Sequence, residues 1–150
     1  MPSNWGASWR RLFCVLAVLA FPAASHAAPE LCKLLTPAQV GAALGGTFEA
    51  GEPIGTTGCS WSSAKPHVIV SLSLPPGEWD RLKSSPLPGI TFTPASGLGD
   101  DAFYATLAPY TMLYVKKGKA VYLFKVYGVQ DKAKQMSAEK TLALDALAKL

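Results

Sequence analysis

The chain has 150 residues, of which 49% are hydrophobic and 16% are charged, and its formal net charge is +4. Without residues 1–27 the formal charge is 12 − 10 = +2, because all ten acidic residues and twelve of the fourteen basic ones follow that segment. A charge this small predicts no nucleic-acid partner, since such binding requires clustered cations.

Residues 1–27 have the pattern of a secretory signal peptide. Two arginines precede an apolar run, LFCVLAVLAF, and small residues lead to an expected cleavage between Ala27 and Ala28. The apolar run is shorter than the ~20 residues that span a bilayer. We therefore predict one exported domain, residues 28–150, in the periplasm or outside the cell, without a stable membrane span in the mature chain.

The predicted mature domain contains two cysteines, Cys32 and Cys59, and one histidine, His67. An even pair in an oxidising compartment predicts a disulfide, worth on the order of 3 kcal/mol on the chain-entropy model. Zinc requires three or four ligands and thiol catalysis requires a free cysteine beside a histidine. A serine triad would have to use His67, which has no nucleophile-elbow glycines nearby. We therefore expect no metal, no cofactor and no catalytic residue.

The first element in chain order is a short helix that begins after Leu35. Thr36 is placed as its N-cap, Pro37 as its first residue and Gln39 as the partner in a capping box, and Gly45-Gly46 ends it. Residues 47–54 are a weak strand candidate. Residues 59–61 put Cys59 and Trp61 on one face if extended, and residues 68–74 alternate as a half-buried strand does.

The second half predicts a short helix over 75–84 that carries Trp79 and Leu82 on one face. Extended segments follow at 90–93 and 103–107, and then a hairpin formed by 111–116 and 119–126. A longer helix covers 131–150. Its expected apolar stripe consists of Met136, Ala143, Leu147 and Leu150, with Leu144 beside it.

The order of these elements predicts an α+β fold with a single domain. The late strands follow one another through short links, which favours a mainly antiparallel sheet over parallel crossovers. We expect helices to cover mostly one face of this sheet.

The segment Gly97-Leu-Gly-Asp-Asp-Ala102 fits the pattern of a dinucleotide-binding turn, G-x-G-x-x-G/A. The acidic residue needed about 20 positions later is missing, and two aspartates would repel a pyrophosphate. A calcium loop is the second alternative, but alternating donors and a twelfth-position glutamate are missing. We interpret the segment as a structural turn in which Gly97 and Gly99 have positive φ and Asp100 bonds its own backbone. Phe103 and Tyr104 then enter the next strand on opposite faces.

Taken together, these motifs carry a family resemblance. Leu34-Leu-Thr-Pro-Ala-Gln-Val40, Gly58-Cys-Ser-Trp61, the glycine-aspartate turn and the Lys/Gly hairpin before a C-terminal helix resemble a group of small exported domains of unknown function. These domains are common as actinobacterial lipoproteins. The resemblance spans about residues 31–149 and implies that the two cysteines pair and that the glycine-aspartate turn is structural. This chain lacks a lipobox cysteine, and the family supplies no catalytic residues.

One face of the last strand is a candidate binding face, formed by Lys119, Val121, Leu123, Lys125 and Tyr127. Its apolar side chains with a cationic rim suit a small apolar ligand, a lipid or an envelope protein. We therefore predict a non-enzymatic binding or accessory module. The alternative is that a helix covers this face and the lysines extend past it.

Two other functions are consistent with the sequence. A secreted inhibitor or immunity-type protein shares the small size, the export signal and the disulfide. A small hydrolase would need paired carboxylates of different pKa, drawn from Glu78, Asp80, Asp100 and Asp101.

Overall fold

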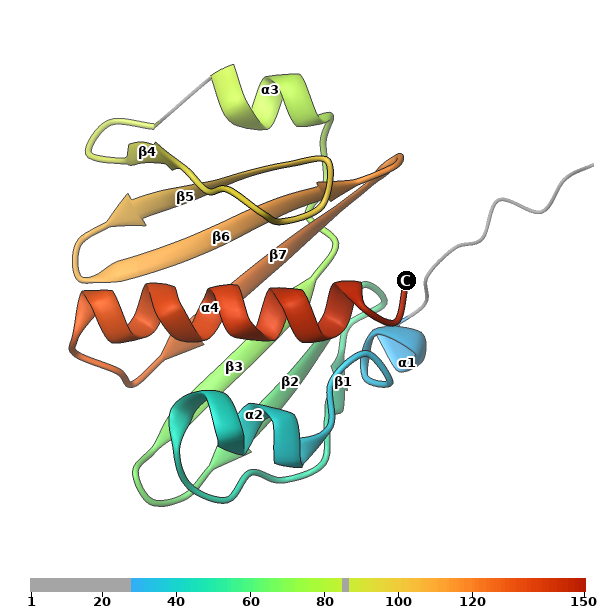
Figure 1. The fold of residues 1–150 in the computed structure, drawn as a ribbon, viewed down its shortest axis with the longest axis vertical. Coiled ribbons are helices and arrows are strands. Elements are labelled where there is room, and N and C mark those ends of the chain that lie inside the picture. The colour runs from blue at the N-terminus through green and yellow to red at the C-terminus, as the bar shows by residue number, and fades with distance from the viewer. Residues whose placement is uncertain (1–27, 85–86) are drawn as a thin grey trace, which may run out of the picture.

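The computed structural model describes residues 28–84 and 87–150, so the predicted signal peptide lies outside the described residues. The elements in chain order are α1 (Ala28–Leu31), α2 (Pro37–Leu44), β1 (Glu52–Ile54), β2 (Gly58–Ser63), β3 (Val68–Ser73), α3 (Trp79–Ser84), β4 (Thr91–Pro94), β5 (Asp101–Leu107), β6 (Tyr110–Lys117), β7 (Ala120–Tyr127) and α4 (Lys132–Leu147) (Figure 1). In this part of the chain, no helix combines the length and apolar character needed to cross a membrane.

The strands form one seven-stranded sheet in the order β1-β2-β3-β7-β6-β5-β4. Every neighbouring pair is antiparallel. Two meanders, β1 to β3 and β4 to β7, meet where β3 pairs with β7, and α3 carries the chain from β3 to the far edge. The predicted α+β fold with a mainly antiparallel sheet is confirmed.

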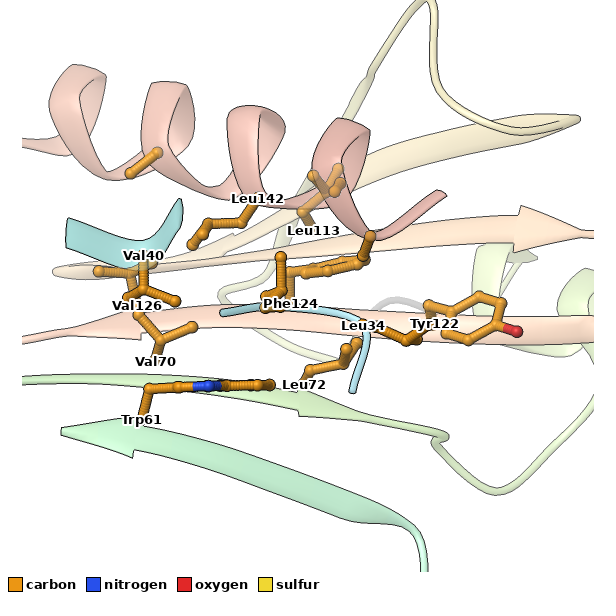
Figure 2. Close-up of a cluster of buried hydrophobic side chains, with 14 of the residues drawn as sticks. Leu34, Val40, Trp61, Val70, Leu72, Leu113, Tyr122, Phe124, Val126 and Leu142 are labelled. Carbon is orange, nitrogen blue, oxygen red and sulfur yellow. The ribbon is translucent and has the colours of Figure 1, made fainter. Parts of the chain in front are cut away.

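The main core lies between the sheet and the helices that cover one face. Figure 1 shows α4 running across the sheet, with α1 and α2 beside it. In Figure 2, Leu142 of α4 extends toward the sheet side chains Phe124 and Val126. The predicted alternation in β3 is present, because Val68, Val70 and Leu72 are buried while the residues between them are only partly so.

The N-terminal segment is held to the core by a cap and a disulfide. The Thr36 hydroxyl accepts from the Gln39 amide at 3.2 Å, and the Gln39 side chain accepts from the Thr36 amide at 3.0 Å, which forms the predicted capping box. Cys32 and Cys59 form the predicted disulfide, with 5.3 Å between their Cα atoms. Trp61 lies two residues beyond Cys59 in β2, and its side chain is fully buried.

The long helix α4 begins after Asp131, whose side chain accepts from the Lys134 amide. The prediction of its apolar stripe is partly wrong, because the side chains of Leu144 and Leu150 are 47% and 44% exposed. The buried residues of α4 are Gln135, Ala138, Glu139, Leu142, Ala143 and Ala146. Two polar side chains therefore occupy core positions that the apolar pattern did not mark.

The short helix α3 covers part of the opposite face. The prediction of a helix over 75–84 is too long at its start: α3 begins only at Trp79, because Gly77 has φ of 114°, which no right-handed helix contains. Trp79 packs on Phe103 and Ala105, whose side chains leave β5 on the side away from α4, and the half-buried Leu82 joins this second cluster. Tyr104, the residue between them, belongs to the main core, so Phe103 and Tyr104 lie on opposite faces, as predicted.

Candidate functional site

The sheet face opposite α4 carries a groove of about 360 Å³, which we call the open-face groove. It is lined by Arg81, Leu82, Leu87, Ile90, Phe92, Ala105, Met112 and Tyr114. Arg81 and Leu82 come from α3, and the other six residues come from the segment before β4 and from β4, β5 and β6. Most of this lining is apolar, as in sites for small molecules.

Strand register explains why the sheet is hollow here. Ala105 of β5 is paired with Phe92 of β4 on one side and with Met112 of β6 on the other. Directly opposed residues in an antiparallel pair point to the same face. A methyl group between two long side chains leaves a depression, and Ala105 therefore forms the floor of the groove.

An aromatic cluster stiffens the end of the groove near the start of β5. Phe103 stacks on Tyr114, with 4.9 Å between ring centroids and 12° between ring planes. Phe92 and Trp79 pack on the same Phe103 ring, at 4.8 and 5.2 Å between centroids. Burial raises the pKa of the Tyr114 hydroxyl above its usual value.

Arg81 is the charged residue in the groove lining. Within residues 28–84 and 87–150, the Arg81 guanidinium forms no ion pair or hydrogen bond. Lys83, on the same helix, pairs instead with Asp101 at 2.6 Å. The groove therefore combines apolar walls with one unneutralised cation.

Exposed apolar side chains continue from the groove toward the turn between β5 and β6. Leu107 and Tyr110 flank this turn and are 46% and 49% exposed. Tyr127 at the end of β7 is 37% exposed, and its ring lies 5.9 Å from that of Tyr110. These three residues define what we call the hairpin-tip patch.

The binding face predicted from the sequence lies on this same side of the sheet. Lys119 and Tyr127 are exposed, Val121 and Lys125 are half-buried, and Leu123 is buried at 7% exposure. Val121 packs against the cluster around Trp79. The sequence thus indicated the face of β7 beside the groove but none of the groove lining. The segments 90–93 and 103–107 were predicted only as extended, without a buried or exposed face.

The glycine-aspartate turn joins β4 and β5 to the turn between β6 and β7. Gly97 and Gly99 have φ of 76° and 52°, the positive values expected from the sequence. Asp100 does not bond its own backbone as expected. Its carboxylate accepts from the Gly118 amide at 2.6 Å, and its amide donates to the Lys116 carbonyl at 2.8 Å. The turn is therefore a brace between two hairpins.

Asp101 attaches α3 to the start of β5. Its carboxylate accepts from Lys83 Nζ at 2.6 Å, from Trp79 Nε1 at 3.1 Å and from the Ala102 amide at 2.9 Å. The hydrogen bond from Lys83 holds the pKa of Asp101 below its usual value. Both aspartates of the turn are thus occupied by structural contacts, whereas Glu78 and Asp80 are exposed.

Behind the hairpin-tip patch, α4 inserts two polar side chains between the ends of β6 and β7. The Gln135 side-chain carbonyl accepts from the Thr111 amide at 3.1 Å, and its amide donates to the Val126 carbonyl. The Glu139 carboxyl accepts from the Thr111 hydroxyl at 3.0 Å and from the Val126 amide at 3.3 Å. The regular pairing of β6 with β7 starts only at Leu113 and Phe124, so these side chains replace ladder bonds at the splayed end.

Glu139 is fully buried, and desolvation raises its pKa to about 8. Burial, with a further contribution from Glu139, raises the pKa of Tyr104 to about 12. The Tyr104 hydroxyl donates to the Met136 carbonyl of α4 at 2.9 Å. Because these hydrogen bonds join α4 to β6 and β7, we call the pair Gln135 and Glu139 the Gln135–Glu139 wedge.

Among the residues that the structure describes, no group of three or more His, Cys, Asp or Glu side chains is placed to hold a metal ion. Comparisons with protein-family models, curated proteins and solved structures found no match. The family resemblance drawn from the motifs therefore stays a prediction.

Proposed function

We propose that this chain is an exported, non-enzymatic binding module that takes a small apolar ligand in the open-face groove. The observation that carries the proposal is the groove itself, an apolar hollow of about 360 Å³ on the sheet face that α4 leaves uncovered. Its volume lies at the lower end of the ~300–1,000 Å³ found for small-molecule sites.

Export is supported by two independent features. The N-terminal pattern is that of a signal peptide, and the Cys32–Cys59 disulfide belongs to an oxidising compartment. We place function in the groove rather than in the carboxylates considered for a hydrolase, because Asp100 and Asp101 hold the fold together.

A neutral fluorescent probe, N-phenyl-1-naphthylamine, tests the proposal on purified, delipidated protein. We expect saturable binding of one probe per chain with a rise in fluorescence. Ala105→Val adds volume at the groove floor and should weaken this binding, while Thr106→Val at the neighbouring position should not. Met112→Gln makes one wall polar and provides a second test if Ala105→Val lowers stability. Probe binding that is absent, or unchanged in both groove variants, would contradict the proposal.

A second candidate, a secreted inhibitor or immunity-type protein, is favoured by the hairpin-tip patch. Protein interfaces are enriched in tyrosine, and a contiguous exposed apolar patch is typical of them. Affinity capture from the cell envelope distinguishes the two functions. A stoichiometric protein partner that is lost with Tyr110→Ser and retained with Ala105→Val would favour the inhibitor function.

A further inference from the structure

We propose that the ligand of the open-face groove is an anionic amphiphile with a single acyl chain, whose head group binds Arg81. This inference rests on the proposed function and narrows it to one class of ligand.

Arg81 supplies the argument for an anionic head group. The other seven lining residues carry no charge, so a ligand in the groove meets a single cation at its rim. A guanidinium binds carboxylate and phosphate groups through two parallel hydrogen bonds.

The acidic groups near Arg81 leave its charge available. Asp101 is held by Lys83, Trp79 and the Ala102 amide. Asp80 precedes Arg81 in α3, where adjacent residues do not face each other, and neither Asp80 nor Glu78 forms an ion pair in the described part of the chain. An incoming anion would therefore not compete with an internal partner.

The shape of the groove supplies the argument for one acyl chain. Its walls are the aliphatic side chains of Leu82, Leu87 and Ile90, and its floor is Ala105. Met112 on one side is unbranched and adapts to irregular apolar shapes. At about 360 Å³ the groove suits one chain rather than the two of a bilayer phospholipid.

Tyr114 adds a donor within the groove lining. No partner for its hydroxyl is found among residues 28–84 and 87–150, and the half-buried ring lies in the groove lining. This hydroxyl can donate to an oxygen of the proposed head group, a contact that a purely hydrocarbon ligand does not offer.

The experiment is displacement of N-phenyl-1-naphthylamine by straight-chain carboxylates and by alcohols of equal length, below their micelle concentrations. We expect the carboxylate to bind at least about tenfold tighter than the alcohol, as for a charge-assisted hydrogen bond. Each added methylene should tighten binding about fourfold until the groove is filled.

Arg81→Gln should remove the preference for the carboxylate, so that carboxylate and alcohol of equal length bind this variant with about the same affinity. Arg81→Lys should restore part of the difference. The matched control is Lys132→Gln, which removes an exposed cation at the start of α4 and should change neither affinity.

The outcomes separate this inference from the proposed function. Equal binding of carboxylate and alcohol, with both weakened by Ala105→Val, would overturn the anionic head group while the groove function stands. Binding to vesicles of anionic phospholipid together with no displacement by free carboxylates would overturn the single-chain ligand in favour of a membrane surface. Failure of the probe itself to bind would remove both proposals.

Discussion

Glu139→Gln is the substitution whose effect the structure specifies most closely. The carboxyl is fully buried in the wedge between β6 and β7, and its pKa is raised to about 8 from an ordinary value of 4.5. The folded state therefore holds a proton on Glu139 between pH 4.5 and 8, where the unfolded chain has released it. Since the folded state binds more protons in this window, stability falls as pH rises through it.

The magnitude follows from these two pKa values. At 1.36 kcal/mol for each pH unit, the wild-type chain loses about 5 kcal/mol of stability from this group between pH 4.5 and pH 8. The glutamine side chain has the same shape and no charge. Its carbonyl accepts from the Val126 amide, and its amide donates to the Thr111 hydroxyl.

Urea unfolding of wild-type and Glu139→Gln protein at pH 5, 6.5, 8 and 9 measures the effect. We expect similar stability at pH 5 and a difference in favour of the variant that grows to several kcal/mol at pH 8 and then levels off. Glu52→Gln, an exposed position in β1, is the control and should show no such trend. A difference between wild type and Glu139→Gln that is constant across these pH values would refute the reasoning, because it would mean that Glu139 titrates normally in the fold.

Three further predictions follow from the structure. Gly99→Val should destabilise the fold by several kcal/mol in thermal unfolding, because Gly99 has positive φ and a Cβ there would meet the Lys116 carbonyl and, at 2.9 Å, Val115. Gly97→Ala, at a position with open space around it, should cost only about 1 kcal/mol of stability. Equal losses of stability in the two variants would contradict this account. Reduction of the Cys32–Cys59 disulfide should lower the free energy of unfolding, measured in urea, by on the order of 3 kcal/mol. A variant with both cysteines changed to serine is the control, and reductant should not change its stability. Asp101→Asn should weaken probe binding in the groove while lowering the unfolding temperature only slightly, because the ion pair of Asp101 with Lys83 is partly exposed and mainly fixes α3. Unchanged probe affinity would argue against that role.

Local patterns were sufficient for the elements that depend on nearby residues. The capping box at Thr36 and Gln39 is formed within four residues, and the alternation in β3 reflects one buried face. The positive φ values at Gly97 and Gly99 follow from a turn that only glycine adopts at low cost. Each of these signals is complete within a short stretch of sequence, so each was predicted.

The contact between α4 and the sheet could not be predicted from a short stretch of sequence. Gln135 and Glu139 lie at helical spacing with Leu142 and Ala146, but a polar side chain is buried only where partners exist for it. Those partners, the Thr111 and Val126 backbone groups, are released by the splay of β6 from β7, which is a tertiary feature. The same reason hid the partner of Asp100, which lies 18 residues away at Gly118.

The groove also depends on pairing between segments distant in sequence. Phe92, Ala105 and Met112 adjoin only because β4, β5 and β6 pair in one particular register. In the sequence these are three ordinary strand residues, and nothing there indicates that Ala105 would lie between the larger side chains of Phe92 and Met112.

The supports of the groove differ in strength, and this difference bears on how a ligand is selected. The groove floor belongs to β5, and the start of β5 is fixed by the contacts of Asp100 and Asp101. Along its whole length β5 pairs with β6, and Thr111 near the start of β6 is held by the Gln135–Glu139 wedge. The wall on α3 is a helix of six residues, held to the sheet by the Trp79 ring and the contacts to Asp101. The floor is therefore held by more contacts than the wall that carries Arg81, so the position of the proposed head-group contact depends on the attachment of α3 to Asp101. Selection of the proposed ligand would then depend on the charge of its head group and, until the groove is filled, on the length of its chain.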